Sequence, residues 1–339
     1  MDRRSVARGT GLLVVAFVAT FVLLVGGWAL VARLGSAGPR PSATPVSGPS
    51  PVARGSAPPG PTVPPPADAT ASDAPTFVLL GAGDIADCSL DAAEQTSDLL
   101  LQEPGWIFTT GDNAYEDGSA ADYAACYAPT WGRVLERTIL PAPGNHDWRT
   151  KEAAGYRDYF GARATPSGTT WYATTIGTWH IVVLDSDCGA VGGCGLDSPQ
   201  GQWLKADLEA SREVCTLAIW HHPRWSSGEH GNDRDVGPFW DLLYARRADL
   251  VINGHDHDYE RFGPQDPAGV FDRARGIREI VAGTGGAGLR DFTHGAGNAE
   301  TRIAGTFGVL RLTLHPTGYD WAFLAVDGSV KDSGSSGCH

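Results

Sequence analysis

Five short polar clusters, each placed directly after an apolar strand-like run, constrain the fold of this chain more than any other feature. They are Gly83-Asp84-Ile85, Gly111-Asp112-Asn113-Ala114-Tyr115, Gly144-Asn145-His146-Asp147, Trp220-His221-His222-Pro223 and Gly254-His255-Asp256-His257. In open α/β sheets the ligand crevice lies beyond the carboxyl ends of the strands. We therefore expect the five loops to converge at one edge, and the glycine beside four of them predicts tight turns there.

From Thr76 onward, short β-type runs alternate with helix-type segments, which is typical of a layered α/β domain. The expected strands are at about 76–82, 106–110, 138–142, 179–185, 214–220, 249–253 and 278–282. The expected helices are at about 91–103, 119–136, 151–159, 199–211 and 236–246. Two later apolar segments, 305–313 and 319–326, are expected to form an antiparallel pair.

The N-terminal part has a different character. Residues 11–31 form an uninterrupted apolar run, which is close to the roughly 20 residues needed to cross a bilayer. The arginines before it favour an N-terminus on the inner side. A cleaved signal peptide is the alternative, with a small-residue site at Gly35-Ser36-Ala37.

We thus expect a signal or anchor segment (residues 1–34), a Pro/Ser/Ala/Gly-rich linker (residues 35–75) and a catalytic domain (residues 76–339). The domain would lie outside the cytoplasm, anchored to the cell membrane or secreted.

The charge balance excludes one class of partner. The chain has 26 Lys and Arg against 39 Asp and Glu, with a net charge of −13 and no basic cluster, so we expect no nucleic-acid partner. The six cysteines suit an oxidising compartment. Cys188–Cys194 is the first pairing we expect because a short Gly-rich loop separates them, and Cys88–Cys126 is the second.

The polar clusters offer carboxylate, phenol and amide oxygens together with imidazole nitrogens. This donor set suits Fe, Zn, Mn or Mg. The expected metal ligands are Asp84, Asp112, Tyr115, Asn145, His221, His255 and His257. His222 is an alternative to His221, although the His-x-Pro register favours His221.

The ordered set closely resembles the motifs GDx, GDxxY, GNH[DE], HxP and GHxH of the calcineurin-like metallophosphoesterases, and within them the purple acid phosphatase branch. The resemblance covers roughly residues 76–313. It implies a four-layer αββα sandwich of two mixed β-sheets. It also implies that Asp84, Asp112, Tyr115 and His257 hold one metal ion, that Asp112, Asn145, His221 and His255 hold the other, and that Asp112 bridges them.

One departure from many relatives bears on the metals. Ala86 stands where those relatives have a histidine ligand, and Tyr115 would supply the missing donor. Because a phenolate is a hard anion that favours a trivalent ion, we expect Fe(III) there, with Fe, Zn or Mn as the second metal.

The expected reaction is hydrolysis of a small phosphorylated substrate, first of all a phosphate monoester, by a metal-activated hydroxide. His230 would donate a proton to the leaving group, and His146 is the second candidate for this role. His146 would also contact phosphate, oriented by Asp147. A phosphodiesterase or nucleotide pyrophosphatase with the same metals is one alternative. The other is a non-catalytic surface binding protein on a phosphatase scaffold, which would have lost ligands.

Overall fold

The computed structural model describes residues 75–339. The predicted anchor or signal segment (residues 1–34) and all but the last residue of the predicted linker (residues 35–75) lie outside the described residues, so both stay predictions. Between residues 75 and 339, no helix is both long enough and apolar enough to cross a bilayer.

A mixed sheet of six strands, in the order β13-β12-β11-β1-β2-β3, forms one half of the fold. β1 (Phe77–Ala82) lies inside this sheet, parallel to β2 (Trp106–Thr109) and antiparallel to β11 (Gly308–His315). The remaining members are β3 (Thr138–Leu140), β12 (Gly318–Ala325) and β13 (Val330–Gly337). The predicted antiparallel pair is confirmed as β11 and β12.

The second sheet has seven strands in the order β10-β8-β9-β7-β6-β5-β4. Its parallel centre consists of β5 (Trp179–Val183), β6 (Cys215–Ile219), β7 (Leu250–Asn253) and β9 (Arg278–Ala282). These four strands are buried along their whole length, because helices or the other sheet cover both faces. The outer members are β4 (Tyr172–Ile176), β8 (Tyr259–Phe262) and β10 (Ala299–Ile303).

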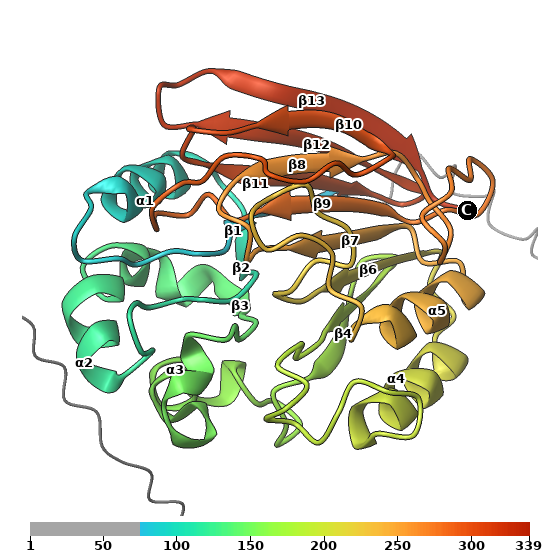
Figure 1. Cartoon of the computed structure of the whole chain (residues 1–339), viewed down its shortest axis with the longest axis horizontal. Coiled ribbons are helices and arrows are strands. Elements are labelled where there is room, and N and C mark those ends of the chain that lie inside the picture. Colours follow the sequence, from blue (N-terminus) through green and yellow to red (C-terminus); the bar gives the residue numbers. More distant parts are fainter. Residues whose placement is uncertain (1–74) are drawn as a thin grey trace, which may run out of the picture. The chain divides into compact units, whose positions relative to one another are not determined.

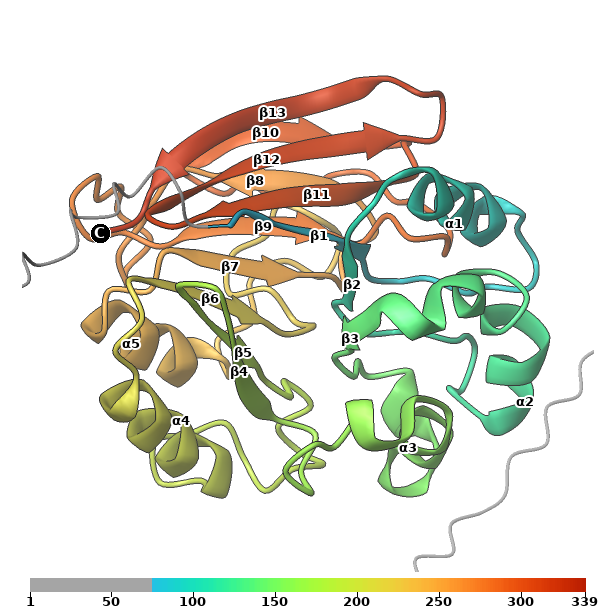
Figure 2. The same cartoon turned by 180° about the vertical axis from the view of Figure 1, so that it is seen from behind.

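Three apolar cores separate four layers. One core lies between the sheets and takes Phe108 and Leu310 from the first and Ile181 and Ile252 from the second. A second core packs the first sheet against α1 and α3, and a third packs the second sheet against α4 and α5. Figures 1 and 2 show the helices on the two outer sides. The predicted αββα sandwich of two mixed sheets is confirmed.

Most expected helices are present, namely α1 (Ala92–Gln102), α3 (Ala154–Phe160), α4 (Pro199–Ala210) and α5 (Gly237–Ala245). Ser198 caps α4 by accepting a hydrogen bond from the Gly201 amide at 3.0 Å, and proline occupies the first helical position.

The predicted single helix over 119–136 is wrong. The segment breaks into α2 (Ala120–Asp122), a π-helical turn (Tyr123–Tyr127) and a 3₁₀ segment (Trp131–Arg137). Pro129 has no N–H to continue the helical ladder, and Thr130 leaves the helical region with φ −106° and ψ −98°.

Four strands were not expected, and β13 shows why. Its sequence, VKDSGSSG, has no apolar alternation, because it is an edge strand with half-exposed to exposed side chains. Backbone pairing with β12 sets its register. β8 begins two residues after the polar cluster that ends at His257, so its sequence resembled a loop.

All six cysteines form disulfides. The predicted pairs Cys88–Cys126 and Cys188–Cys194 are confirmed, and the third is Cys215–Cys338. The third bond joins β6 of the second sheet to the end of β13 in the first.

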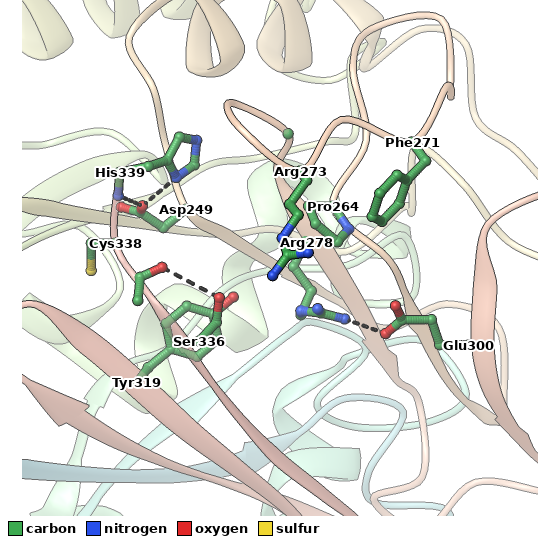
Figure 3. Close-up of a pocket in the computed structure, with 12 residues that line it drawn as sticks. Asp249, Pro264, Phe271, Arg273, Arg278, Glu300, Tyr319, Ser336, Cys338 and His339 are labelled. Atoms are coloured by element: carbon green, nitrogen blue, oxygen red, sulfur yellow. Dashed lines mark hydrogen bonds and ion pairs between the residues drawn. The ribbon is translucent and has the colours of Figure 1, made fainter.

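A cavity of about 400 Å³ lies at the other ends of the strands from the polar clusters. Asp249 precedes β7 and Arg278 begins β9, whereas the clusters follow these parallel strands. In Figure 3, Asp249 pairs with His339 at 2.8 Å and Arg278 with Glu300 at 2.6 Å, so charged wall groups offset each other. No predicted site residue lines this cavity.

Candidate metal centre

The five polar clusters leave the sheets at the carboxyl ends of parallel strands. Asp84 follows β1, Asp112 follows β2, Asn145 follows β3, His221 follows β6 and His255 follows β7. Backbone hydrogen bonds tie the loops together, including Asp84 N to Gly111 O (3.0 Å) and Gly254 N to His221 O (3.0 Å). Because the two sheets face each other, loops from both meet at one edge, as the sequence predicts.

The backbone at this edge has an uncommon conformation. Asp84, Asp112 and His255 have positive φ values of 58°, 50° and 71°. Such left-handed residues cost conformational energy and cluster at functional sites. At Gly144 an added Cβ would lie 2.3 Å from Asp112 Oδ1, so glycine is required for the close approach of this loop.

The first donor group consists of Asp84, Asp112, Tyr115 and His257. The Tyr115 hydroxyl lies 3.0 Å from Asp84 Oδ1, 3.2 Å from Asp112 Oδ2 and 3.2 Å from His257 Nε2. His257 Nε2 is also 3.2 Å from Asp84 Oδ1. Neighbouring ligands of one ion bonded at about 2.0–2.2 Å have similar spacings.

The second donor group consists of Asp112, Asn145, His221 and His255. His221 Nε2 lies 3.2 Å from Asp112 Oδ2, 3.1 Å from Asn145 Oδ1 and 3.2 Å from His255 Nδ1. Asp112 Oδ2 therefore belongs to both groups. The structure brings together all seven residues that the sequence nominates as ligands. Ligand atoms of Asp84, Asp112 and His221 also lie within 4.8 Å of one another, so the two groups adjoin, and the assignment of each residue to one ion stays a prediction.

The hydrogen bonds of two histidines test whether a cation fits. His221 Nδ1 lies 2.9 Å from Thr110 O, and His257 Nδ1 lies 2.7 Å from Gly288 O. Because a carbonyl only accepts, each Nδ1 carries a proton, and Nε2, which faces a carboxylate, is the ring atom that could bind a metal ion. Lone pairs that converge in this way require positive charge, so the donor set fits N/O-binding metal ions.

The acid–base properties agree with that requirement. Burial opposes ionisation of Asp112, but the neighbouring His221 outweighs it and holds the pKa of the Asp112 carboxyl well below its usual range. Burial lowers the pKa of His221, whereas Asp112 raises it more, to about 9. A proton on His221 and a metal ion are alternative sources of the charge that these buried carboxylates need.

His146 lies beside the first donor group, with its ring centroid 4.3 Å from that of Tyr115. Its Nδ1 contacts Glu116 O at 2.6 Å, and Arg149 Nη2 contacts its Nε2 at 3.2 Å. The expectation that Asp147 orients His146 is wrong, because Glu116 and Arg149 hold the ring.

Asp147 is buried beneath the loop that carries Asn145. Its carboxylate accepts hydrogen bonds from the Gly144 amide (2.9 Å), the Asn113 side chain (2.9 Å) and the Tyr123 hydroxyl (2.7 Å). It thus shapes the loop and makes no contact with the His146 imidazole.

His230 lies beside the second donor group, stacked on His255 at 4.2 Å. Its amide donates to Asp256 Oδ1 at 2.8 Å, and Arg290 Nη1 lies 3.0 Å from its Nε2. Burial is the largest cause that lowers the pKa of His230, which favours the neutral ring.

The choice between His221 and His222 follows from their contacts. His221 presents Nε2 to Asp112 and Asn145, whereas His222 Nδ1 lies 2.8 Å from the Ser186 hydroxyl. Burial lowers the pKa of His222 to about 3, so its ring is neutral.

Four residues near the centre were missed from the sequence, namely Glu116, Arg149, Ser186 and Arg290. Arg149 contacts His146 and Glu116. Arg290 contacts His230 and Glu229 in the same way. Of these four, only Arg149 could have been nominated from the sequence, because it lies four residues after the predicted ligand Asn145.

Comparison with known proteins places these features in a family. Residues 72–259, more than half of the chain, match the family model described as calcineurin-like phosphoesterase. Purple acid phosphatase 15 of Arabidopsis thaliana is 29% identical over 208 residues, which cover 50% of this chain and 38% of that protein. The chain therefore spans less than half the length of that relative.

Solved structures share the fold. A purple acid phosphatase, PPD1, from yellow lupin (Lupinus luteus) seeds superposes with a TM-score of 0.61 at 18% identity, covering 78% of this chain and 54% of that one. GAP50, the anchor in the inner membrane complex of Plasmodium, superposes with a TM-score of 0.55 at 15% identity, covering 78% and 89%. Because one of these two proteins is an anchor, the shared fold does not establish catalysis, and the functional argument depends on the side chains of the site.

Proposed function

This chain belongs to the calcineurin-like phosphoesterase family, and we propose that it hydrolyses phosphate monoesters at a centre of two metal ions. The observation that carries the proposal is the arrangement of seven donors as two groups that share Asp112 Oδ2. The proximity of all seven nominated residues supports the proposal and disfavours a non-catalytic binding protein on the same scaffold.

The metals we propose are Fe(III) in the first donor group and Fe, Zn or Mn in the second. Tyr115 supports the trivalent ion, because a phenolate oxygen is a hard anionic ligand. When bound, the two cations would neutralise phosphate oxygens and lower the pKa of water. The buried carboxylates Asp84 and Asp112 would hold both ions, and the carbonyls of Thr110 and Gly288 would fix the histidine rings.

The remaining residues position the substrate and move a proton. His146 and His230 flank the two donor groups, so each ring can reach a group bound between them. We propose that His230, in its protonated form, would donate a proton to the leaving-group oxygen, and that His146 would contact the phosphate. The bound anion would favour protonation of His230, whose ring is otherwise neutral. Arg149 and Arg290 donate hydrogen bonds to Nε2 of His146 and His230. When phosphate binds, both guanidinium groups would shift toward it, because a charged anion is a stronger acceptor than an imidazole nitrogen.

The compartment and partners follow from charge and disulfides. Three disulfides suit an oxidising environment, so we propose that the domain lies outside the cytoplasm. The proposed partner is a small phosphorylated substrate, and the N-terminal segment is proposed to attach the protein to a membrane or direct its secretion.

Metal analysis with paired assays tests the proposal. We expect two metal ions per chain and faster hydrolysis of p-nitrophenyl phosphate than of bis(p-nitrophenyl) phosphate. Asp112→Asn should lower kcat/KM at least about 100-fold, because it removes the shared ligand. The control is Asp98→Asn, which alters a surface acid paired with Arg133. Full activity after complete metal removal, or faster diester hydrolysis, would contradict the proposal.

A further inference from the structure

The Nδ1 atom of His222 forms a hydrogen bond with a hydroxyl group, and in this respect His222 differs from three other histidines at the centre. In His146, His221 and His257, Nδ1 faces a backbone carbonyl, so the proton lies on Nδ1 and Nε2 offers a lone pair. The partner of His222 is Ser186, whose hydroxyl both donates and accepts.

The contacts of Ser186 favour one direction for that hydrogen bond. The backbone amide of His222 donates to Ser186 Oγ at 3.0 Å, and Oγ lies 2.8 Å from His222 Nδ1. Among residues 75–339 the Ser186 hydroxyl contacts no acceptor other than Nδ1, so donation to Nδ1 is the arrangement that uses its proton. A neutral His222 in this arrangement carries its proton on Nε2.

The His222 ring lies against the second donor group. Its centroid is 4.3 Å from that of His255 and 5.0 Å from that of His221. His222 Nε2 has no partner among the described residues, and the ring is partly exposed. Ring nitrogens of His221, His222 and His255 lie within 4.8 Å of one another, so His222 is close to any group bound at the centre. With its proton on Nε2, His222 presents an N–H donor there.

The loop that holds Ser186 is itself fixed. The Asp185 amide donates to Gln200 Oε1 at 2.8 Å, and Gln200 Nε2 donates to Asp185 O at 2.8 Å. The Cys188–Cys194 disulfide closes the same loop two residues later. Ser186 is 3% exposed, so the Ser186–His222 pair is preorganised before any ligand arrives.

We propose that His222 is a substrate-contacting residue whose Nε2–H donates a hydrogen bond to a non-bridging oxygen of the bound phosphate group, with Ser186 as its positioning residue. This inference rests on the proposed function, because it concerns the same substrate. A neutral donor orients the phosphate and leaves the charge of the neighbouring donor groups unchanged.

Four variants measure this role in the full-length, metal-loaded protein. His222→Ala should lower kcat/KM for p-nitrophenyl phosphate about 10- to 100-fold, the effect of one hydrogen bond to a charged group. His222→Gln, whose amide supplies an N–H near the position of Nε2, should stay within about threefold of the native protein. Ser186→Ala should have an intermediate effect and add nothing in the His222→Ala background. The control is His315→Gln, a surface histidine paired with Asp320.

Two further readouts do not depend on turnover. NMR should place the His222 proton on Nε2 in the native protein, and calorimetry with inorganic phosphate should show weaker binding by His222→Ala, again about 10- to 100-fold. An inactive native protein that still binds phosphate through His222 would refute the proposed hydrolysis and support this inference. Loss of metal from His222→Ala, a proton on Nδ1, or unchanged phosphate affinity would overturn it.

Discussion

At the residue scale, three donors of the candidate centre are positioned by neighbours that have no proposed metal-binding role. Backbone carbonyls orient His221 and His257, and Gly144 makes room for Asp112. Substitutions at such positions are expected to act through ligand geometry.

Tyr115→Phe tests the assignment of iron to the first donor group. We expect the native protein to show a visible tyrosinate-to-iron absorption band that this variant lacks, because phenylalanine has no oxygen to bind the ion. The control is Tyr127→Phe, since Tyr127 is also buried but its hydroxyl has no partner among the described residues. A colourless, active protein with two zinc or two manganese ions would refute the iron assignment and leave hydrolysis intact.

Arg290→Gln tests the role of positive charge at the rim. Arg290 contacts Glu229 and His230 and is about one-third exposed. We expect its loss to raise KM for p-nitrophenyl phosphate about three- to tenfold with a smaller change in kcat, because it weakens attraction of the anion. Arg163→Gln is the matched control, with equal side-chain exposure and a surface partner in Glu136. An equal effect of both substitutions would exclude a specific role.

Asp185 should make stability depend on pH. Burial is the largest influence and raises the pKa of this carboxyl to about 7, against 3.8 for the ordinary group. Its stabilising contribution is therefore full below about pH 4 and is lost as pH rises toward 7, when the buried group ionises.

The measurement compares urea unfolding of the native protein and Asp185→Asn at pH 4 and pH 8. From pH 4 to pH 8 the unfolding free energy of the native protein should fall on the order of 2–4 kcal/mol more than that of the variant. The magnitude follows because each unit of pKa shift corresponds to about 1.4 kcal/mol. An unchanged difference at both pH values would show that Asp185 has an ordinary pKa in the folded protein.

At the element scale, strand ends and disulfides determine which loops can hold the site. Cys215 lies in β6 and Cys338 follows β13, so their bond links the two sheets across a separation of 123 residues. Cys188 and Cys194 are separated by 6 residues and close one loop.

Replacing the two cysteines of each disulfide with serine should distinguish a bond that stabilises the whole fold from one that orders a single loop. The loop-entropy relation predicts a loss of about 5 kcal/mol without Cys215–Cys338 and about 2 kcal/mol without Cys188–Cys194. The smaller loss should nevertheless lower phosphate affinity more, because it frees the loop that contains Ser186. Denaturant unfolding and phosphate titration of both variants provide the test, and the reverse order in either measurement would contradict it.

At the scale of the whole molecule, the candidate metal centre takes its residues from loops of both sheets. Asp84, Asp112 and Asn145 come from the first sheet, and His221, His255 and His257 come from the second. Ions bound by both sets would stabilise the folded state over the unfolded chain.

Metal removal should therefore lower stability. For ions present at 100 to 1,000 times their dissociation constants, chelation should reduce the unfolding free energy by about 3–4 kcal/mol for each ion removed. Restoring the metals should reverse the loss, whereas Asp112→Asn should respond weakly to chelator. Thermal melts of both proteins with and without chelator test this, and an equal loss in both would argue against a centre built on Asp112.

Local sequence determined the types and order of the candidate metal donors. Each nominated ligand stands within a few residues of a strand end, and strand ends can be found from short apolar runs such as 76–82 and 249–253. Because parallel strands of one sheet end at a common edge, those positions implied that the donors of each sheet would lie together. The packing of the two sheets then brought the two sets face to face.

Only the tertiary structure decided what holds each donor in place. The carbonyl of Glu116 rather than Asp147 holds His146, and Ser186 sets the proton of His222, because segments far apart in the chain come together in one register. Backbone carbonyls have no sequence signature, and the edge strand β13 has no apolar pattern. The chemistry of the site was thus a local property of the sequence, whereas the direction of its hydrogen bonds depended on long-range packing.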